Sequence, residues 1–356
     1  MNFRLVWIGS DDNPPERWPL AEDDITQVRS LKSGVMYERQ GTGIVRREQL
    51  ANGRIKLIPV TNFSARIVRD IILDDDAEHR REFGLEAEVG GQKVACVVPA
   101  AEFSRMGWVL RLLGPKAIIY PGQQQHARAA IQCLSGSIQQ ERILTHLGWR
   151  KHDGHWVYLH AGGAVGAEGP RGDLRVELPA ALQHYQVHGP PDVQEQGRAV
   201  RASLRCLSVA PDWISFPLLA AVYRAALGKV DFSLFLTGQT GVFKTALAAL
   251  CQQHFGAAMD DRGLPTNFAS TGNALQWLAF YAKDALLVVD DFAPTGRHGD
   301  SELQNIAECL FRANGNQQGR SRLSGDGRLN VPKPPARWCW QPANKYRRDK
   351  VFAPAC

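Results

Sequence analysis

FSLFLTGQTGVFKTALAALCQQH, residues Phe232 to His254, passes from an apolar run through a glycine-containing turn into an amphipathic helix. The run Phe232 to Leu236 is short and continuous, which is typical of a strand buried on both faces of a parallel sheet. Gly238 and Gly241 allow the backbone to curl around an anion. The helix that begins at Lys244 directs free N–H groups and the positive end of its dipole towards that anion. The stretch therefore predicts a phosphate-binding loop, or P-loop.

The side chains of this loop indicate what it would bind. Lys244 would reach the β- and γ-phosphates of ATP, and the Thr245 hydroxyl would bind Mg²⁺. The usual pattern has a glycine directly before the lysine, where this chain has Phe243. The alternative is a strand, turn and helix with an exposed lysine, because similar loops occur in sheets that bind no nucleotide. The residues expected to surround the nucleotide are Gly238, Gln239, Thr240, Gly241, Val242, Phe243, Lys244 and Thr245.

A second apolar segment ends in two carboxylates. In KDALLVVDDFAP, residues 283–294, the run Ala285 to Val289 is followed by Asp290 and Asp291. We expect Asp290 to bind Mg²⁺ directly or through water, and Asp291 to polarise the attacking water as a general base. The alternative for the pair by itself is a solvated strand end. Together with the loop, the segment predicts an Mg-ATP site in which Lys244 and Asp291 are catalytic and Thr245 and Asp290 hold the metal.

The composition is that of an ordinary globular protein. The 356 residues are enough for two domains, with 44% apolar and 22% charged residues. The net charge of +6 permits an anionic partner such as nucleic acid. The seven cysteines are scattered and contain no C-x-x-C pair, which favours neither disulfides nor zinc and fits a reduced, cytoplasmic setting. No segment has the 18 apolar residues of a membrane span.

The order of patterns predicts an α/β chain in four segments. Residues 1–34 form an N-terminal arm whose fold is uncertain, and residues 35–196 form a β-rich α+β domain. Residues 197–335 alternate strands and helices, which predicts a P-loop NTPase domain with a parallel sheet of the RecA or AAA type. Residues 336–356 form an aberrant tail.

Several local patterns predict individual elements. Leu85–Val89 and Lys93–Val98 read as a hairpin that turns at Gly90-Gly91. Apolar spacing predicts a single helix over Phe103–Leu113. Gly162–Gly169 is glycine-rich, and we expect a flexible loop there in preference to a second phosphate-binding turn.

A polar, basic stretch follows a predicted helix over Ser301–Phe311. Its arginines, Arg312, Arg320 and Arg322, are candidates to touch a γ-phosphate, a neighbouring subunit or a nucleic-acid backbone. A solvated loop is the alternative for each of them.

With these motifs placed, the chain resembles the bacterial P-loop proteins catalogued as domain of unknown function 927. The matching stretches are VTNFSARIVRDI at 60–71, VPAAEF at 98–103, HLGWR at 146–150, PLLAAVYRAALG at 217–228, LTGQTGVFKTALAAL at 236–250 and AKDALLVVDDFAPTG at 282–296. The resemblance implies a helicase-type ATPase that acts on DNA during replication of phages, plasmids or integrated elements. It also implies a separate primase as partner and a homo-oligomer, by analogy a hexamer.

The tail departs from this family after Pro335. ARWCWQPANKYRRDKVFAPAC has neither helix nor strand periodicity, whereas the family has an apolar strand with a polar sensor for the γ-phosphate at this point. One permitted back-translation, read two nucleotides on, gives LVLATGEQIPPGQSLRARL. We therefore predict a frameshift, with a divergent natural tail as the alternative. The product would bind ATP but lack a central strand, and its hydrolysis would be impaired.

Two other functions remain open at this point. The first is a regulatory nucleotide-binding module without motor activity, which DNA-stimulated ATP turnover would distinguish from a motor. The second is a small-molecule kinase, which would need a pocket for an acceptor.

Overall fold

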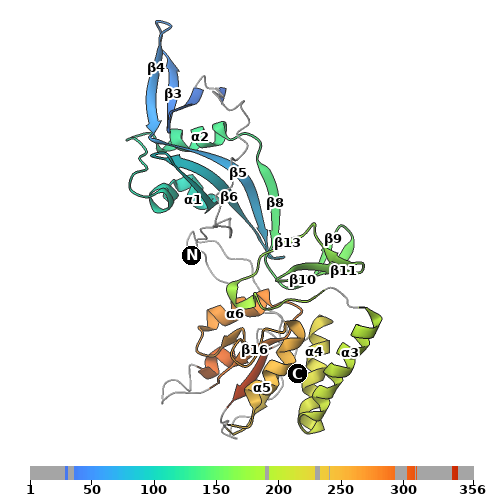
Figure 1. Ribbon diagram of the computed structural model, residues 1–356. Helices are drawn as coiled ribbons and strands as arrows, with labels where there is room; N and C mark the ends of the chain where they lie inside the picture. The colour runs from blue at the N-terminus through green and yellow to red at the C-terminus, as the bar shows by residue number, and fades with distance from the viewer. Residues whose placement is uncertain are drawn as a thin grey trace. The chain divides into compact units, whose positions relative to one another are not determined.

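The computed structural model describes residues 36–188, 192–228, 233–239, 241–292, 303–308 and 310, together with the backbone of 29–30 and 339–343. The chain is a mixed α/β protein with several sheets (Figure 1). It divides into two compact units, which are described separately. The first unit comprises residues 1–73 and 79–142, and the second comprises residues 74–78 and 143–356.

The described residues of the first unit form two sheets and two α-helices. Its strands are β1 (Arg29–Ser30), β2 (Met36–Gln40), β3 (Gly43–Gln49), β4 (Ile55–Thr61), β5 (Phe63–Asp74), β6 (His79–Val89), β7 (Gln92–Pro99) and β8 (Gln139–Leu144); its helices are α1 (Ala100–Arg105) and α2 (Gln124–Leu134). One sheet has the order β1-β2-β3-β4, and the other contains β8-β5-β6-β7. Tyr37, Phe63 and Trp108 are among its fully buried side chains.

The predicted hairpin at Gly90-Gly91 is confirmed. β6 and β7 pair antiparallel up to Val89 and Gln92. Both glycines have positive φ, 56° and 81°, as a tight two-residue turn between twisted strands requires.

The predicted single helix over Phe103–Leu113 is wrong. α1 ends at Arg105 because Met106 adopts a left-handed conformation with φ of 56°, and a π-helical turn follows over Val109–Leu113. Apolar residues at helical spacing fill the core on both sides of this break, so the spacing alone did not reveal it.

The second unit begins with small strands and continues with alternating strands and helices. The elements are β9 (Gly148–His152), β10 (His155–His160), β11 (Gly163–Gly166), β12 (Gly169–Arg171), β13 (Arg175–Val176), α3 (Val193–Leu204), α4 (Asp212–Ala226), β14 (Leu234–Thr237), α5 (Lys244–Gln252), β15 (Thr266–Asn267), α6 (Gly272–Tyr281), β16 (Leu287–Asp290) and β17 (Cys339–Ala343). Residues 303–308 are also helical, within the helix predicted over Ser301–Phe311. The prediction of a flexible loop over Gly162–Gly169 is wrong, because β11 and β12 pair there in the sheet β12-β11-β10-β9.

A parallel sheet with the order β14-β17-β16-β15 lies at the centre of the α/β part. β17 pairs with β14 on one side and with β16 on the other. The expectation that the tail forms no element is therefore wrong for Cys339–Ala343. Two strands with a gap between them leave N–H and C=O groups that need partners, and an extended segment of almost any sequence can supply them. The rest of the tail, the N-terminal arm and Arg312, Arg320 and Arg322 lie outside the described residues.

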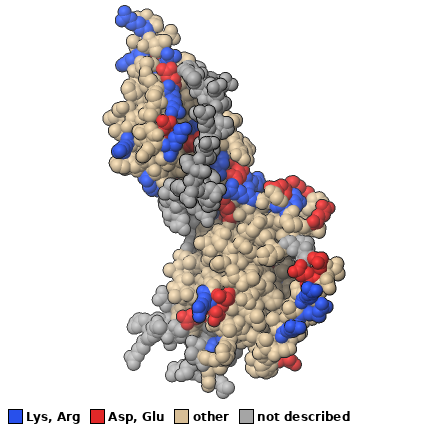
Figure 2. Space-filling model, in the orientation of Figure 1, with Lys and Arg blue, Asp and Glu red and all other residues tan. Residues whose placement is uncertain are grey.

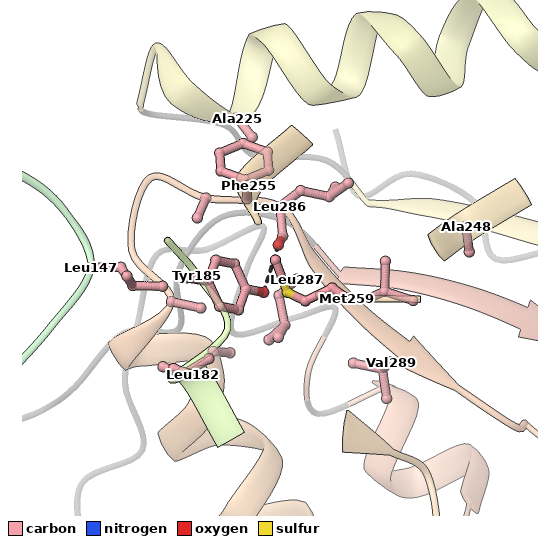
Figure 3. Close-up of a cluster of buried hydrophobic side chains, with 14 of the residues drawn as sticks. Leu147, Leu182, Tyr185, Ala225, Ala248, Phe255, Met259, Leu286, Leu287 and Val289 are labelled. Carbon is pink, nitrogen blue, oxygen red and sulfur yellow. Dashed lines mark hydrogen bonds between the residues drawn. The ribbon is translucent and has the colours of Figure 1, made fainter. Parts of the chain in front are cut away.

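The core of the second unit joins the small strands to the α/β part. Leu147, Leu182 and Tyr185 pack with residues of α5 and β16 in one buried cluster (Figure 3). The Tyr185 hydroxyl donates a hydrogen bond of 2.8 Å to the Leu286 carbonyl (Figure 3). The compact unit that begins at Ile143 therefore includes both the small strands and the α/β part, and the domain boundary at residue 196 stays a prediction.

Within the described part of the chain, no helix has the length and apolar content needed to cross a bilayer.

Candidate functional site

Two described residues of the loop between β14 and α5 have left-handed backbone conformations. Gly241 has a φ of 85°, which favours glycine. Phe243, directly before α5, is also left-handed, with φ of 57° and ψ of 28°. A side chain in that conformation costs roughly 1–2 kcal/mol, which explains why a glycine is usual at this position. Phe243 is 82% exposed, so no packing in the described structure offsets that cost.

Lys244 begins α5 and is buried, with 8% of its surface exposed. Its Nζ donates hydrogen bonds to the carbonyls of Gly238, at 3.1 Å, and Gln239, at 2.6 Å. The ammonium group is therefore held against the loop by weak, neutral acceptors. A phosphate that entered the loop would offer a charged acceptor, which makes a stronger hydrogen bond than a carbonyl does.

Thr245 and Asp290 meet although they lie 45 positions apart in the sequence. Thr245 Oγ1 donates to Asp290 Oδ1 at 3.2 Å. A hydroxyl and a carboxylate are oxygen ligands of the kind that Mg²⁺ prefers, and Mg²⁺ is usually bound by one or two carboxylates together with water and substrate phosphates. No group of three or more His, Cys, Asp or Glu suited to a metal occurs among the residues that the structure describes. Asp290 with Thr245 thus fits Mg²⁺ better than a metal held entirely by protein ligands.

Gln252 at the end of α5 explains why these two side chains meet. It is fully buried, its Nε2 donates to the Leu286 carbonyl at 2.7 Å, and its Oε1 accepts from the Val288 N–H at 2.8 Å. The helix is therefore attached to β16 through both functions of one amide. Because Gln252 and Thr245 lie on the same short helix, this attachment fixes Thr245 beside the carboxyl end of β16.

The start of β16 is anchored by charged and polar contacts. Lys283 forms an ion pair with Asp76, and the Asp284 carboxylate accepts a hydrogen bond from the Trp149 N–H at 3.1 Å. Burial raises the pKa of Asp76, but the hydrogen bond and charge of Lys283 outweigh this and leave the pKa lowered. Gly148 has a φ of 89°, and an added Cβ would lie 2.2 Å from the Lys283 carbonyl oxygen. Only glycine allows this approach.

One pocket of about 920 Å³ brings the predicted residues together. Gly241, Phe243, Lys244, Thr245, Asp290 and Asp291 all line it. Its volume lies within the range of about 300–1,000 Å³ that is usual for ligand pockets. Gly238, Gln239 and Val242 are in the loop but do not line the pocket, and Thr240 lies outside the described residues.

The pocket also contains residues that sequence reasoning missed. Asp261, Arg262, Asn267 and Ser270 line it from the segment around β15. β15 is parallel to β16, and Asn267 is opposite Asp290 in the register. The carboxyl ends of parallel strands meet at one edge of a sheet, so the polar residues after each strand were the available clue.

Arg262 is a second cation in this pocket. Its loop is held by Asp260, whose Oδ1 accepts hydrogen bonds from the N–H groups of Arg262 at 3.0 Å and Gly263 at 2.8 Å. Arg262 forms no ion pair with any residue that the structure describes. Its charge is therefore available to an anionic ligand in the pocket.

Comparisons with known proteins were made for the sequence and for the structure. No protein-family model and no curated protein matches the sequence. The resemblance to domain of unknown function 927 therefore stays a prediction. Among solved structures, the chain is similar to one described as "SCCmec type IV Cch - active helicase", with a TM-score of 0.44 and 12% sequence identity. The match covers 88% of this chain and 55% of that one, so this chain spans about half the length of that protein.

Proposed function

We propose that this chain binds ATP with Mg²⁺ in a P-loop site of the helicase-type ATPases, and that its altered tail impairs hydrolysis. The observation that carries the proposal is the hydrogen bond of 3.2 Å between Thr245 Oγ1 and Asp290 Oδ1, beside Lys244 in one pocket. Two sequence motifs that were identified independently meet there. An exposed lysine in an unrelated turn would have no reason to lie beside a threonine and a carboxylate at the end of a parallel strand.

Each residue has a separate role in this proposal. The free N–H groups at the start of α5 and the Lys244 ammonium bind the phosphates, and Arg262 adds positive charge in the same pocket. Thr245 and Asp290 would hold Mg²⁺, which supplies charge neutralisation for the phosphates. Asp291 is exposed and lines the pocket, so it would orient and deprotonate the attacking water.

The proposal extends to DNA as the partner of a helicase-like ATPase of mobile elements. A separate primase and a homo-hexamer are part of the same expectation, and both rest on the family resemblance alone. They are tested separately from ATP binding.

A second function, ATP binding without motor activity, is supported by β17. This strand pairs with both β14 and β16, and its Pro342 is opposite Leu236. Proline has no N–H to donate, so it is rare within central strands. Position 342 therefore weakens the strand that a helicase-type ATPase would use to carry its γ-phosphate sensor.

Two measurements on the purified full chain decide between these functions. Equilibrium titration with ATP, with and without Mg²⁺, tests the site, and we expect saturable binding that Mg²⁺ strengthens. Phosphate release with and without DNA then separates a motor from a binding module, because only a motor is stimulated by DNA. Failure to bind any nucleoside triphosphate would refute the proposed function.

A further inference from the structure

We propose that the tip of the β3–β4 hairpin in the first unit is a nucleic-acid-binding element. The hairpin is formed by β3 (Gly43–Gln49) and β4 (Ile55–Thr61), and Figure 1 shows that it extends beyond the rest of its unit. The inference names the part of the chain that would hold the DNA partner in the proposed function. It rests on features of the first unit alone.

The tip has a defined conformation. β3 and β4 stay in register out to Gln49 and Ile55. The connecting loop is closed by hydrogen bonds from the Leu50 N–H to the Arg54 carbonyl, at 2.8 Å, and from the Gly53 N–H to the Leu50 carbonyl, at 2.9 Å. At the base, Arg46 Nη1 lies 2.9 Å from Nε2 of His126, which belongs to α2. A two-stranded ribbon of this kind can enter the major groove of a duplex.

All residues from Gln49 to Leu57 are exposed. They include three large apolar side chains with no cover in the described structure: Leu50 is 41% exposed, Ile55 59% and Leu57 42%. Between them stand Arg54 and Lys56, and the stretch contains no acidic residue. Neither cation forms an ion pair with a described residue. Figure 2 shows blue atoms at the outer end of this hairpin.

The first unit carries an excess of positive charge. Residues 36–73 and 79–142 of the first unit contain 15 Arg and Lys against 8 Asp and Glu, an excess of seven positive charges. A polyanion is therefore attracted to these residues of the first unit.

Almost all of the acidic side chains described in the first unit form ion pairs within that unit. Seven of the eight carboxylates in residues 36–73 and 79–142 form ion pairs with arginines of the same ranges. The charges left without an ion pair are therefore mostly positive. Arg54 and Lys56 carry two of them on the β3–β4 hairpin, which extends beyond the rest of its unit (Figure 1). On such a ribbon, Arg54 and Lys56 would contact the phosphates that flank a groove of the DNA. Leu50, Ile55 and Leu57 would pack against sugars and base edges.

The test measures binding of the full chain to a fluorescently labelled 25-base-pair DNA by anisotropy over a range of salt concentrations. Two phosphate contacts should contribute about 1.8 to the slope of log K against log salt, which is about 30-fold in affinity at 0.15 M salt. We expect Arg54→Ala/Lys56→Ala to cause both changes. Ile55→Ser/Leu57→Ser should lower the affinity and leave the slope unchanged.

A matched control removes the same charge elsewhere on the unit. Lys93→Ala/Lys116→Ala changes two exposed lysines that lie outside this hairpin. Equal losses in the hairpin and control variants would overturn the inference, because they would show only a general charge effect. Wild-type protein that does not bind DNA would overturn it as well.

Two further measurements distinguish DNA binding by the hairpin from membrane binding and from a failure of the ATP site. Binding of the wild-type chain to phosphatidylserine vesicles, lost in the hairpin variant while DNA binding persists, would overturn it in favour of a membrane surface. ATP affinity of the hairpin variant should equal that of the wild type, because no residue of the hairpin lines the nucleotide pocket. Failure of ATP binding therefore reports on the proposed function and failure of DNA binding on this inference.

Discussion

Replacing Lys244 by methionine removes the ammonium group and keeps most of the apolar stem. In the structure this group donates to the carbonyls of Gly238 and Gln239. Gly238 is half-buried and Gln239 is exposed, so water can replace the lost donor and the free energy of unfolding should fall by less than about 1 kcal/mol. These contacts with the loop come in addition to the predicted contact of Lys244 with the phosphates.

The effect on ATP binding should be much larger than the effect on stability. A hydrogen bond to a charged group contributes about 1.5–3 kcal/mol, which corresponds to a loss of about 10- to 150-fold in ATP affinity. Isothermal titration measures the affinity, and thermal unfolding measures the stability of the same samples. Lys151→Met, at an exposed lysine of the same unit, is the control and should change neither.

Either of two results would refute this reasoning. An unchanged ATP affinity in Lys244→Met would mean that the ammonium does not bind phosphate. A stability loss of several kcal/mol would mean that Lys244 is a structural group whose contact with the loop matters more than its charge.

The remaining predictions concern the pocket, the buried histidine and the tail. Asp291→Asn should slow ATP hydrolysis more than ATP binding, whereas Asp290→Asn should make binding less dependent on Mg²⁺; indistinguishable effects in rate and titration assays would show that the roles are misassigned. Phe243→Gly should stabilise the protein by about 1 kcal/mol and raise Tm by a few degrees, because it removes left-handed strain and no buried contact; a lower Tm would contradict this. Burial lowers the pKa of His146 below its ordinary 6.5. Below about pH 6.5 the unfolded chain therefore binds a proton at this histidine more readily than the folded chain does, and the free energy of unfolding should fall as the pH drops. His146→Gln should reduce that slope in chemical unfolding, and an unchanged slope would assign it to other groups. Restoring the predicted reading frame should raise ATP turnover, and robust turnover by the 356-residue chain itself would refute the idea of a lost sensor strand.

The position of β17 bears on this last prediction. The codons of Cys339–Ala343 overlap those that read VLATG in the shifted frame, at the place where the structure has a central parallel strand. The frameshift itself stays a prediction until the gene is sequenced. The structure changes the defect that we expect in the sheet. The central position is filled by a strand that contains proline and tryptophan and lacks the polar sensor, so no gap is left between β14 and β16.

Local patterns were enough to predict elements whose signals are short-range. The β6–β7 turn at Gly90-Gly91 and the helix start at Lys244 depend on backbone preferences that are written into a few neighbouring residues. The left-handed turn at Met106 was not predicted, because methionine has no preference for a left-handed backbone. Phe103 and Trp108, on either side of that break, are buried in the same core.

The sequence by itself determined which side chains could perform the chemistry: Lys244, Thr245, Asp290 and Asp291 could all be named from two motifs. Only the tertiary structure decided that Thr245 and Asp290 touch, that Arg262 joins them, and that Gln252 attaches α5 to β16. The physical reason is the range of each interaction. Chain direction and hydrogen bonding within a motif act over a few residues, whereas a pocket forms where parallel strands distant in sequence end at the same edge of a sheet.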